Sequence, residues 1–100
     1  MDNPLKTARE LQLRIQQSSS AELPTLADDL LLFLYRLKDE YRIVKSSGRS
    51  VTGKSFSVLD DLIYRLESSP DATLTTASTV EFVKSLLGDL VQGNILIQKK

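Results

Sequence analysis

The sequence contains no cysteine and no histidine among its 100 residues. The absence of cysteine excludes disulfide bonds, thiol catalysis and thiolate metal sites. The absence of histidine removes the commonest general base and the commonest nitrogen ligand for metals. On this inventory we expect a protein that is not an enzyme and that uses no cofactor or metal.

The chain also lacks net charge, because 13 basic residues balance 13 acidic ones. Nucleic-acid-binding proteins usually present a basic surface, so we expect no nucleic-acid partner. The longest apolar run, from Leu30 to Tyr35, is far shorter than the ~20 residues that span a bilayer. The first residues, MDNPLKTARE, are charged and lack the apolar region of a secretory signal. These absences predict a soluble, cytoplasmic protein.

What the sequence does contain is apolar residues at helical spacing throughout its length. The length and the 41% apolar fraction predict one domain over residues 1–100, with one core. Four helices are expected, at about residues 4–18, 25–46, 57–68 and 78–92. Amphipathic helices joined by short loops predict an all-α fold, an antiparallel four-helix bundle with a short C-terminal tail.

The apolar stripes of these helices predict the core. In the first helix the stripe is Leu5, Ala8, Leu11 and Ile15, and Leu13 lies off it. In the second helix the seam is Leu26, Leu30, Phe33, Leu37, Tyr41 and Val44. In the third it is Val58, Leu59, Leu62, Ile63 and Leu66, and in the fourth Val83, Leu86, Leu87 and Leu90. Because the run from Leu30 to Tyr35 makes the middle of the second helix apolar all round, we expect that helix to lie centrally. Leu31, Leu34 and Tyr35 widen its apolar surface beyond one stripe, which would also suit an exposed docking seam.

Helix ends are predicted from capping residues. Asn3 is a good N-cap, and Pro4 suits the first helical position. Capping boxes are expected at Thr25 with Asp28 and at Ser78 with Glu81. Gly93 and Asn94 are good residues for ending the last helix.

The stretch GRSVTGKS, residues 48–55, matches the phosphate-binding P-loop pattern at Gly48, Gly53, Lys54 and Ser55. A P-loop requires a buried parallel strand before the glycines, and parallel strands are nearly continuous apolar runs. The preceding residues, YRIVKSS, carry charges and continue the spacing of the second helix. We therefore predict that the match is coincidental and that this stretch connects two helices. The remote alternative is nucleotide binding through Gly48–Ser55, or weak phosphate binding at the start of the third helix.

Two features suggest a partner-binding surface. Tyr64 is expected on the exposed side of the third helix, either as an interface anchor or as a lone surface aromatic. The tail has three large apolar residues and a basic end: Ile95, Leu96, Ile97, Gln98, Lys99 and Lys100. These apolar residues either fold back over one end of the bundle or dock on a partner or a membrane surface, where each lysine contributes about 1 kcal/mol.

Several segments together resemble the immunity proteins that protect lactic acid bacteria from pediocin-like (class IIa) bacteriocins, the enterocin A immunity type. These segments are FLYRLKDE (residues 33–40), GRSV (48–51), VLDDLIYRL (58–66), TLTTAS (73–78) and VEFVKSLLGDLVQGN (80–94). The resemblance covers most of the chain, but it is one of layout and contains no short invariant motif.

The resemblance implies a non-catalytic cytosolic four-helix bundle at the inner face of the membrane. Such a protein recognises the mannose permease once a bacteriocin has engaged it. The C-terminal half would select the bacteriocin, with the last helix and tail as the recognition element. Many relatives are basic, and this chain is neutral, which weakens the case for membrane attraction. The alternative from a different class is a generic helical adaptor that docks through an exposed seam and forms an oligomer or holds a partner.

Overall fold

Helices make up most of the computed structural model, which describes residues 4–17, 20–47 and 55–100. Within those ranges the chain forms five α-helices, one 3₁₀ turn and two β-strands. The helices are α1 (Pro4–Gln17), α2 (Leu23–Glu40), α3 (Leu59–Ser68), α4 (Pro70–Thr75) and α5 (Ala77–Gln92). The 3₁₀ turn η1 is Ser20–Glu22, and the strands are β1 (Tyr41–Ser46) and β2 (Ile95–Lys99).

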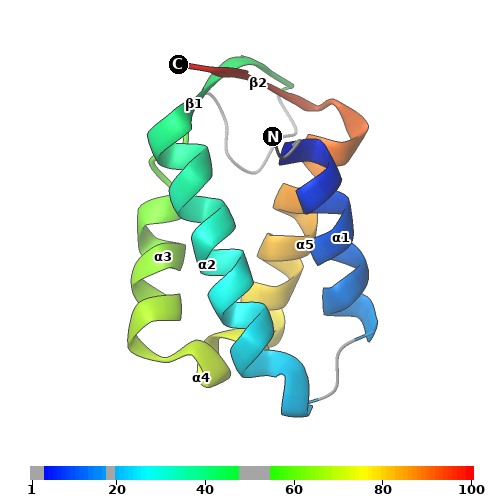
Figure 1. Cartoon of the computed structure of the whole chain (residues 1–100), viewed down its shortest axis with the longest axis vertical. Coiled ribbons are helices and arrows are strands. Elements are labelled where there is room, and N and C mark those ends of the chain that lie inside the picture. The colour runs from blue at the N-terminus through cyan, green and yellow to red at the C-terminus, as the bar shows by residue number, and fades with distance from the viewer. Residues whose placement is uncertain (1–3, 18–19, 48–54) are drawn as a thin grey trace.

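The long helices lie side by side, and both strands cross one end of the helical body (Figure 1). Helix α2 packs against α1, α3 and α4, while α1 packs against α5. The central position expected for the second helix is therefore confirmed. It explains the wide apolar surface of that helix, because Leu34 is fully buried and Leu31 is half-buried.

The buried apolar side chains of the described residues form one cluster, to which every α-helix and β2 contribute. The predicted stripes supply most of it: Ala8, Leu11, Leu26, Leu30, Phe33, Leu37, Leu59, Leu62, Ile63, Leu66, Val83, Leu86, Leu87 and Leu90 are all buried. Leu13 is exposed, as expected for a residue off the stripe. Three residues of the predicted stripes are not buried: Leu5, Val44 and Val58 are each at least 40% exposed.

The prediction that the second helix reaches residue 46 is wrong. Helix α2 ends at Glu40, and Tyr41–Ser46 is strand β1, which pairs antiparallel with β2 from the C-terminus. The alternation of Tyr41 and Ile43 inward with Arg42 outward suits a strand with one buried face. Because β2 lies at the far end of the sequence, the spacing of neighbouring residues did not predict this pairing.

Residues 69–77 were expected to be one of the loops that join the predicted helices, and they instead contain helix α4, which begins at Pro70. Proline suits the first turn of a helix, because its missing N–H has no intrahelical partner there. Helix α3 also begins later than predicted, at Leu59.

Neither expected capping box forms. Helix α2 begins at Leu23, upstream of Thr25, because η1 continues directly into it, and its N-cap residue is Glu22. Helix α5 begins at Ala77 after Thr76, whose hydroxyl donates to the carbonyl oxygen of Ala72 at 2.8 Å. That hydroxyl is therefore used by α4 and does not cap α5. The proposed N-cap Asn3 lies outside the described residues, and Pro4 does begin α1.

The end of α5 follows the prediction. Gly93 has φ of +83°, and its N–H donates to carbonyl oxygens in the last turn, while the Asn94 N–H bonds the Asp89 carbonyl oxygen at 2.9 Å. This is the Schellman arrangement, which closes a helix with a left-handed residue. It turns the chain from α5 into β2.

Two glycine substitutions are expected to change stability in opposite directions. Gly93→Ala should lower the free energy of unfolding by about 1–2 kcal/mol, because a Cβ disfavours the left-handed conformation. Gly88→Ala lies inside α5, where the new Cβ would meet Gln12 Nε2 at an ordinary 3.5 Å, and should raise stability by about 0.5–1 kcal/mol. Urea unfolding of both variants measures this, and equal effects at both positions would contradict the left-handed cap.

Candidate functional site

A pocket of about 390 Å³ opens between α3 and α5, in the C-terminal half of the chain. Its lining comes from the start of α3 and the first turns of α5: Val58, Asp61, Leu62, Arg65, Ser78, Thr79 and Phe82. Helix α4 connects these two helices and contacts both of them. The pocket therefore lies beside the place where the chain turns from α3 into α5.

Helix α4 is fixed to the end of α3 by a buried threonine. The Thr73 hydroxyl lies 2.7 Å from the carbonyl oxygen of Ser69 and 3.0 Å from that of Arg65, so its single hydrogen is shared between these two acceptors or donated to one of them. The next residue, Leu74, is buried in the core. A short helix held by a hydroxyl and an apolar side chain has little freedom to move. These two residues therefore fix α4 against the end of α3, beside the pocket.

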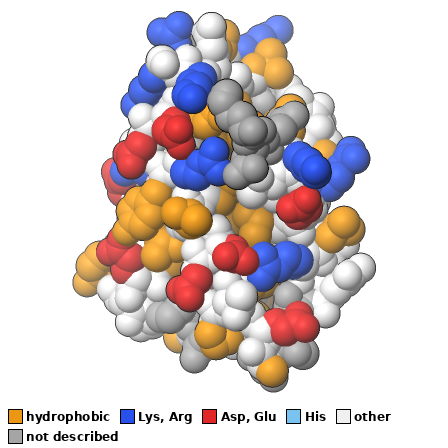
Figure 2. Space-filling view, in the orientation of Figure 1, with side chains coloured by type: hydrophobic (Ala, Val, Ile, Leu, Met, Phe, Trp, Pro, Cys, Tyr) orange, Lys and Arg blue, Asp and Glu red, His pale blue; other side chains and the backbone are white. Residues whose placement is uncertain are grey.

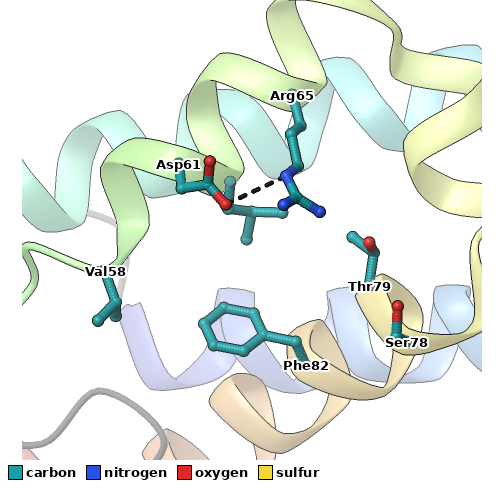
Figure 3. Close-up of a pocket in the computed structure, with 7 residues that line it drawn as sticks. Val58, Asp61, Arg65, Ser78, Thr79 and Phe82 are labelled. Carbon is teal, nitrogen blue, oxygen red and sulfur yellow. Dashed lines mark ion pairs between the residues drawn. The ribbon is translucent and has the colours of Figure 1, made fainter.

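The floor of the pocket is apolar. Leu62 is buried, and Phe82 is half-buried and packs against the core. Figure 3 shows Phe82 on α5 opposite Asp61 and Arg65 on α3, with Val58 at one side of the opening. Val58 is 40% exposed, although it lies directly before Leu59, the first buried residue of α3. An apolar floor with an exposed valine at its edge is suited to receiving apolar groups from a ligand.

The rim of the pocket is polar and charged. Asp61 Oδ2 and Arg65 Nε form an ion pair of 3.1 Å across one turn of α3, and both side chains are more than half exposed. Exposed pairs of this kind contribute little to stability, so each charge can exchange its partner at small cost. The hydroxyl-bearing residues Ser78 and Thr79 lie on the α5 side (Figure 3). The arrangement can bind an apolar group and align a polar one beside it.

Metal binding has no support in the part of the chain that the structure describes. No group of three or more histidine, cysteine, aspartate or glutamate residues there could hold a metal ion. Likewise, none of the described helices combines the length and the apolar character that crossing a bilayer would need.

Tyr64, one of the predicted partner-binding residues, is 68% exposed on α3. It lies one turn after Asp60, which forms an ion pair with Lys38 of α2. Residues four apart on a helix share a face, so Tyr64 belongs to the seam between α3 and α2. It therefore does not line the pocket, whose residues lie on the α5 side of α3.

The structure separates the predicted tail residues into two groups. Ile95 is buried and Ile97 is half-buried, and both pack against the core at the strand end of the molecule. Leu96, Lys99 and Lys100 are exposed. The tail is thus fixed by pairing with β1, with its isoleucines folded inward and its other apolar residue outward.

The P-loop match is only partly described, since Gly48, Gly53 and Lys54 lie outside the described residues. Our expectation of a helix before the match is wrong, because β1 precedes it. That strand nevertheless pairs antiparallel with β2 in a two-stranded sheet, whereas a P-loop follows a strand of a parallel sheet. Ser55 is exposed and precedes the start of α3 at Leu59, so it does not lie in the first helical turn. The described surroundings therefore differ from those of a nucleotide-binding loop.

The pocket residues were not identified from the sequence. Phe82 adjoins the predicted stripe of its helix but was not assigned to it, and Val58 was assigned to the buried face of α3. The spacing of Asp61 and Arg65, four apart, is a signal for an exposed ion pair on a helix. No local signal in the sequence indicates that a pocket lies between α3 and α5.

No family model, no curated protein and no solved structure matches this chain. Its function must therefore be argued from the pocket, the strands and the surface described above.

Proposed function

We propose that this chain is a non-catalytic binding protein and that its binding site is the pocket between α3 and α5. The observation that carries the proposal is an apolar floor, formed by Leu62 and Phe82, that remains open to solvent beside the exchangeable Asp61–Arg65 pair. An open apolar pocket with a polar rim suits an apolar anchor side chain of a protein partner. Val58 at the edge extends the contact surface outward.

The specific form of the proposal is a bacteriocin immunity protein that acts in the cytoplasm at the inner face of the membrane. The segments that resemble the class IIa immunity family, residues 58–66, 73–78 and 80–94, build α3, α4 and α5. These are the elements that form and shape the pocket. In this proposal α1, α2, α3 and α5 correspond to the four helices of the family's bundle. The partner is the mannose permease engaged by a bacteriocin.

The proposal is tested by expressing the chain in a bacteriocin-sensitive strain and measuring how well that strain tolerates bacteriocins. Expression of the chain should raise tolerance to at least one member of a broad class IIa bacteriocin panel. Val58→Glu should abolish that tolerance, because a charge at the edge of the pocket opposes entry of an apolar anchor. Growth at graded bacteriocin concentrations is the measurement.

Leu13→Glu is the matched control. Leu13 is 50% exposed on α1, away from the pocket, so the same chemical change occurs at similar exposure. Both variants should unfold at the same temperature as the unmodified chain. Absence of tolerance to the whole panel would reject the immunity function, and full tolerance with Val58→Glu would reject the pocket.

The second candidate function, a helical adaptor, is favoured by the seam between α2 and α3. Tyr64 is 68% exposed and Tyr35 is 38% exposed. Lys38 of α2 forms an ion pair with Asp60 of α3, and Tyr35 and Tyr64 each lie one turn from these residues along their own helices. Figure 2 shows apolar surface on this side of the molecule, over α2 and α3. An adaptor of this kind predicts a stable oligomer or a co-purifying partner, and Tyr64→Ala should weaken that association. A strictly monomeric chain in sedimentation experiments, with no co-purifying partner, would count against it.

A further inference from the structure

The end of the molecule that carries the two strands is basic. The two segments that form this end, residues 41–47 and 94–100, contain no acidic residue. They contain four cations: Arg42, Lys45, Lys99 and Lys100. Figure 2 shows Lys and Arg side chains gathered toward this end. Because the whole chain has no net charge, the remainder of the molecule carries an excess of acidic groups. The two segments that build the sheet therefore carry a net positive charge, although the chain as a whole is neutral.

An irregularity in the sheet adds apolar groups to this basic end. The register shifts between Ile43 and Lys45, so Val44 has no partner on β2. A bulge of this kind changes the direction of side chains. As a result Val44 and Lys45 are both exposed, and Lys45 pairs opposite the exposed Leu96. Val44 is 59% exposed and Leu96 is 47% exposed, so two apolar side chains lie among the cations.

A pocket of about 310 Å³ adjoins the sheet at the same end. Three cations and two serines line it together with Tyr41, Ile43 and Phe56: Lys38, Arg42, Lys100, Ser55 and Ser57. Ammonium, guanidinium and hydroxyl groups are donors to phosphate oxygens. Lys38 is already paired with Asp60, so Arg42 and Lys100 are the lining cations without an acidic partner among the described residues. Of the other nearby acids, Glu40 accepts from Arg36 Nε at 3.1 Å, Asp89 accepts from the Asn94 amide, and Asp39 is exposed on the last turn of α2.

We propose that this strand end docks on the surface of an anionic phospholipid bilayer. The cations attract the negative surface, Val44 and Leu96 enter the interfacial region, and the adjoining pocket holds a headgroup phosphate. Apolar groups surrounded by cations are the pattern of interfacial binding elements. A nucleic acid or a soluble phosphate would match the cations but would leave the two apolar side chains in water. This inference does not depend on the proposed immunity function.

Vesicle binding by the full chain tests the proposal. The protein should co-sediment with vesicles of phosphatidylcholine that contain phosphatidylglycerol, and not with vesicles of phosphatidylcholine alone. Binding should weaken as salt rises, because exposed charges are screened. Lys45→Gln with Lys99→Gln should weaken binding by about 25-fold, since each cation near an anionic surface contributes about fivefold.

Arg14→Gln with Lys84→Gln is the matched control. It removes the same charge from the end of α1 and the middle of α5, away from the strands (Figure 1). This double variant should bind anionic vesicles within about twofold of the unmodified chain. An equal loss in both double variants would mean that overall charge and not the strand end determines binding, and would overturn the proposal.

Insertion of Leu96 can be observed directly, because the sequence contains no tryptophan. In Leu96→Trp the emission should shift to shorter wavelength when anionic vesicles are added. Leu32→Trp is the control, since Leu32 is 62% exposed on α2, outside the strands, and should show no shift.

Three further outcomes would overturn the proposal: no binding to either vesicle, equal binding to both, or an unchanged Leu96→Trp spectrum. Saturable binding of inorganic phosphate or of duplex DNA without binding to vesicles would assign the cations to that ligand and would also contradict it. The vesicles contain no permease and no bacteriocin. A failure here is therefore distinct from a failure of the tolerance assay.

Discussion

Leu34→Ala is expected to lower the free energy of unfolding by about 3–5 kcal/mol. Leu34 is fully buried in the middle of α2, the helix that contacts α1, α3 and α4. Truncation removes apolar contacts and leaves a cavity that several surrounding helices cannot fill together. A domain of this size is stable by only about 5–10 kcal/mol, so the loss is a large part of the total. Urea and thermal unfolding measure it, with an expected fall in Tm of more than about 10 °C.

Leu32→Ala, two residues away on the same helix, is the control for this prediction. Leu32 is 62% exposed, so its truncation should cost less than about 0.5 kcal/mol. Equal effects of the two substitutions would mean that α2 does not bury the face that contains Leu34. The comparison therefore tests which face of the central helix is buried.

Ile95→Ala is expected to cost about 2–4 kcal/mol, although the residue lies only five positions before Lys100. Ile95 is 1% exposed and joins the core where the strands cover the end of the helices. Its strand is fixed by pairing with β1, and the Lys100 N–H bonds the Glu40 carbonyl oxygen at 2.8 Å. A tail that docked only on a partner would tolerate the substitution without loss.

Leu96→Ala controls for the change in strand propensity, because it places the same residue at the adjacent position of β2. Leu96 is 47% exposed and faces outward, so a cost below about 1 kcal/mol is expected. Denaturant midpoints of the two variants give the comparison. If Ile95→Ala were as mild as Leu96→Ala, the tail would not be part of the fold.

The pairing also means that deletion of residues 95–100 should destabilise the protein, which makes single substitutions the better probes of function.

The helical core was predictable because its signal is local. Residues such as Leu30 and Leu37 in α2, or Leu86 and Leu90 in α5, recur at the helical period, and all four are buried. The left-handed glycine at the end of α5 was predictable for the same reason, since Gly93 follows the last periodic residue. These features depend on neighbours a few positions away.

The strands were not predictable in the same way, because β1 acquires its structure from a partner at the other end of the chain. Tyr41 and Val44 fit the spacing of the preceding helix, while Tyr41 and Ile43 fit the alternation of a strand. Pairing with β2 decided between these two patterns. The tail was accordingly left with two interpretations. Ile95 packs inward, as folding back over the helices requires, whereas docking of the tail on a partner or a membrane stays a prediction.

The pocket depends on the relative placement of two helices, which no single stretch encodes. Val58 was assigned to the core, yet it occupies the N-cap position of α3 and lies at the edge of the pocket. Helix α4, which connects the two helices beside the pocket, was expected to be a loop. The spacing of apolar residues therefore did not predict the candidate site, although it placed each residue of the pocket floor in a helix.

Site-specific crosslinking is the most direct test of the claim that the pocket between α3 and α5 binds the partner. Because the chain has no cysteine, Val58→Cys and Leu13→Cys each carry one attachment point for a photoactivatable crosslinker. In sensitive cells treated with a bacteriocin that the chain neutralises, the probe at position 58 should crosslink to a permease subunit. The probe at position 13 should not, and neither should crosslink without bacteriocin. Equal crosslinking from both positions, or none from position 58, would contradict the account.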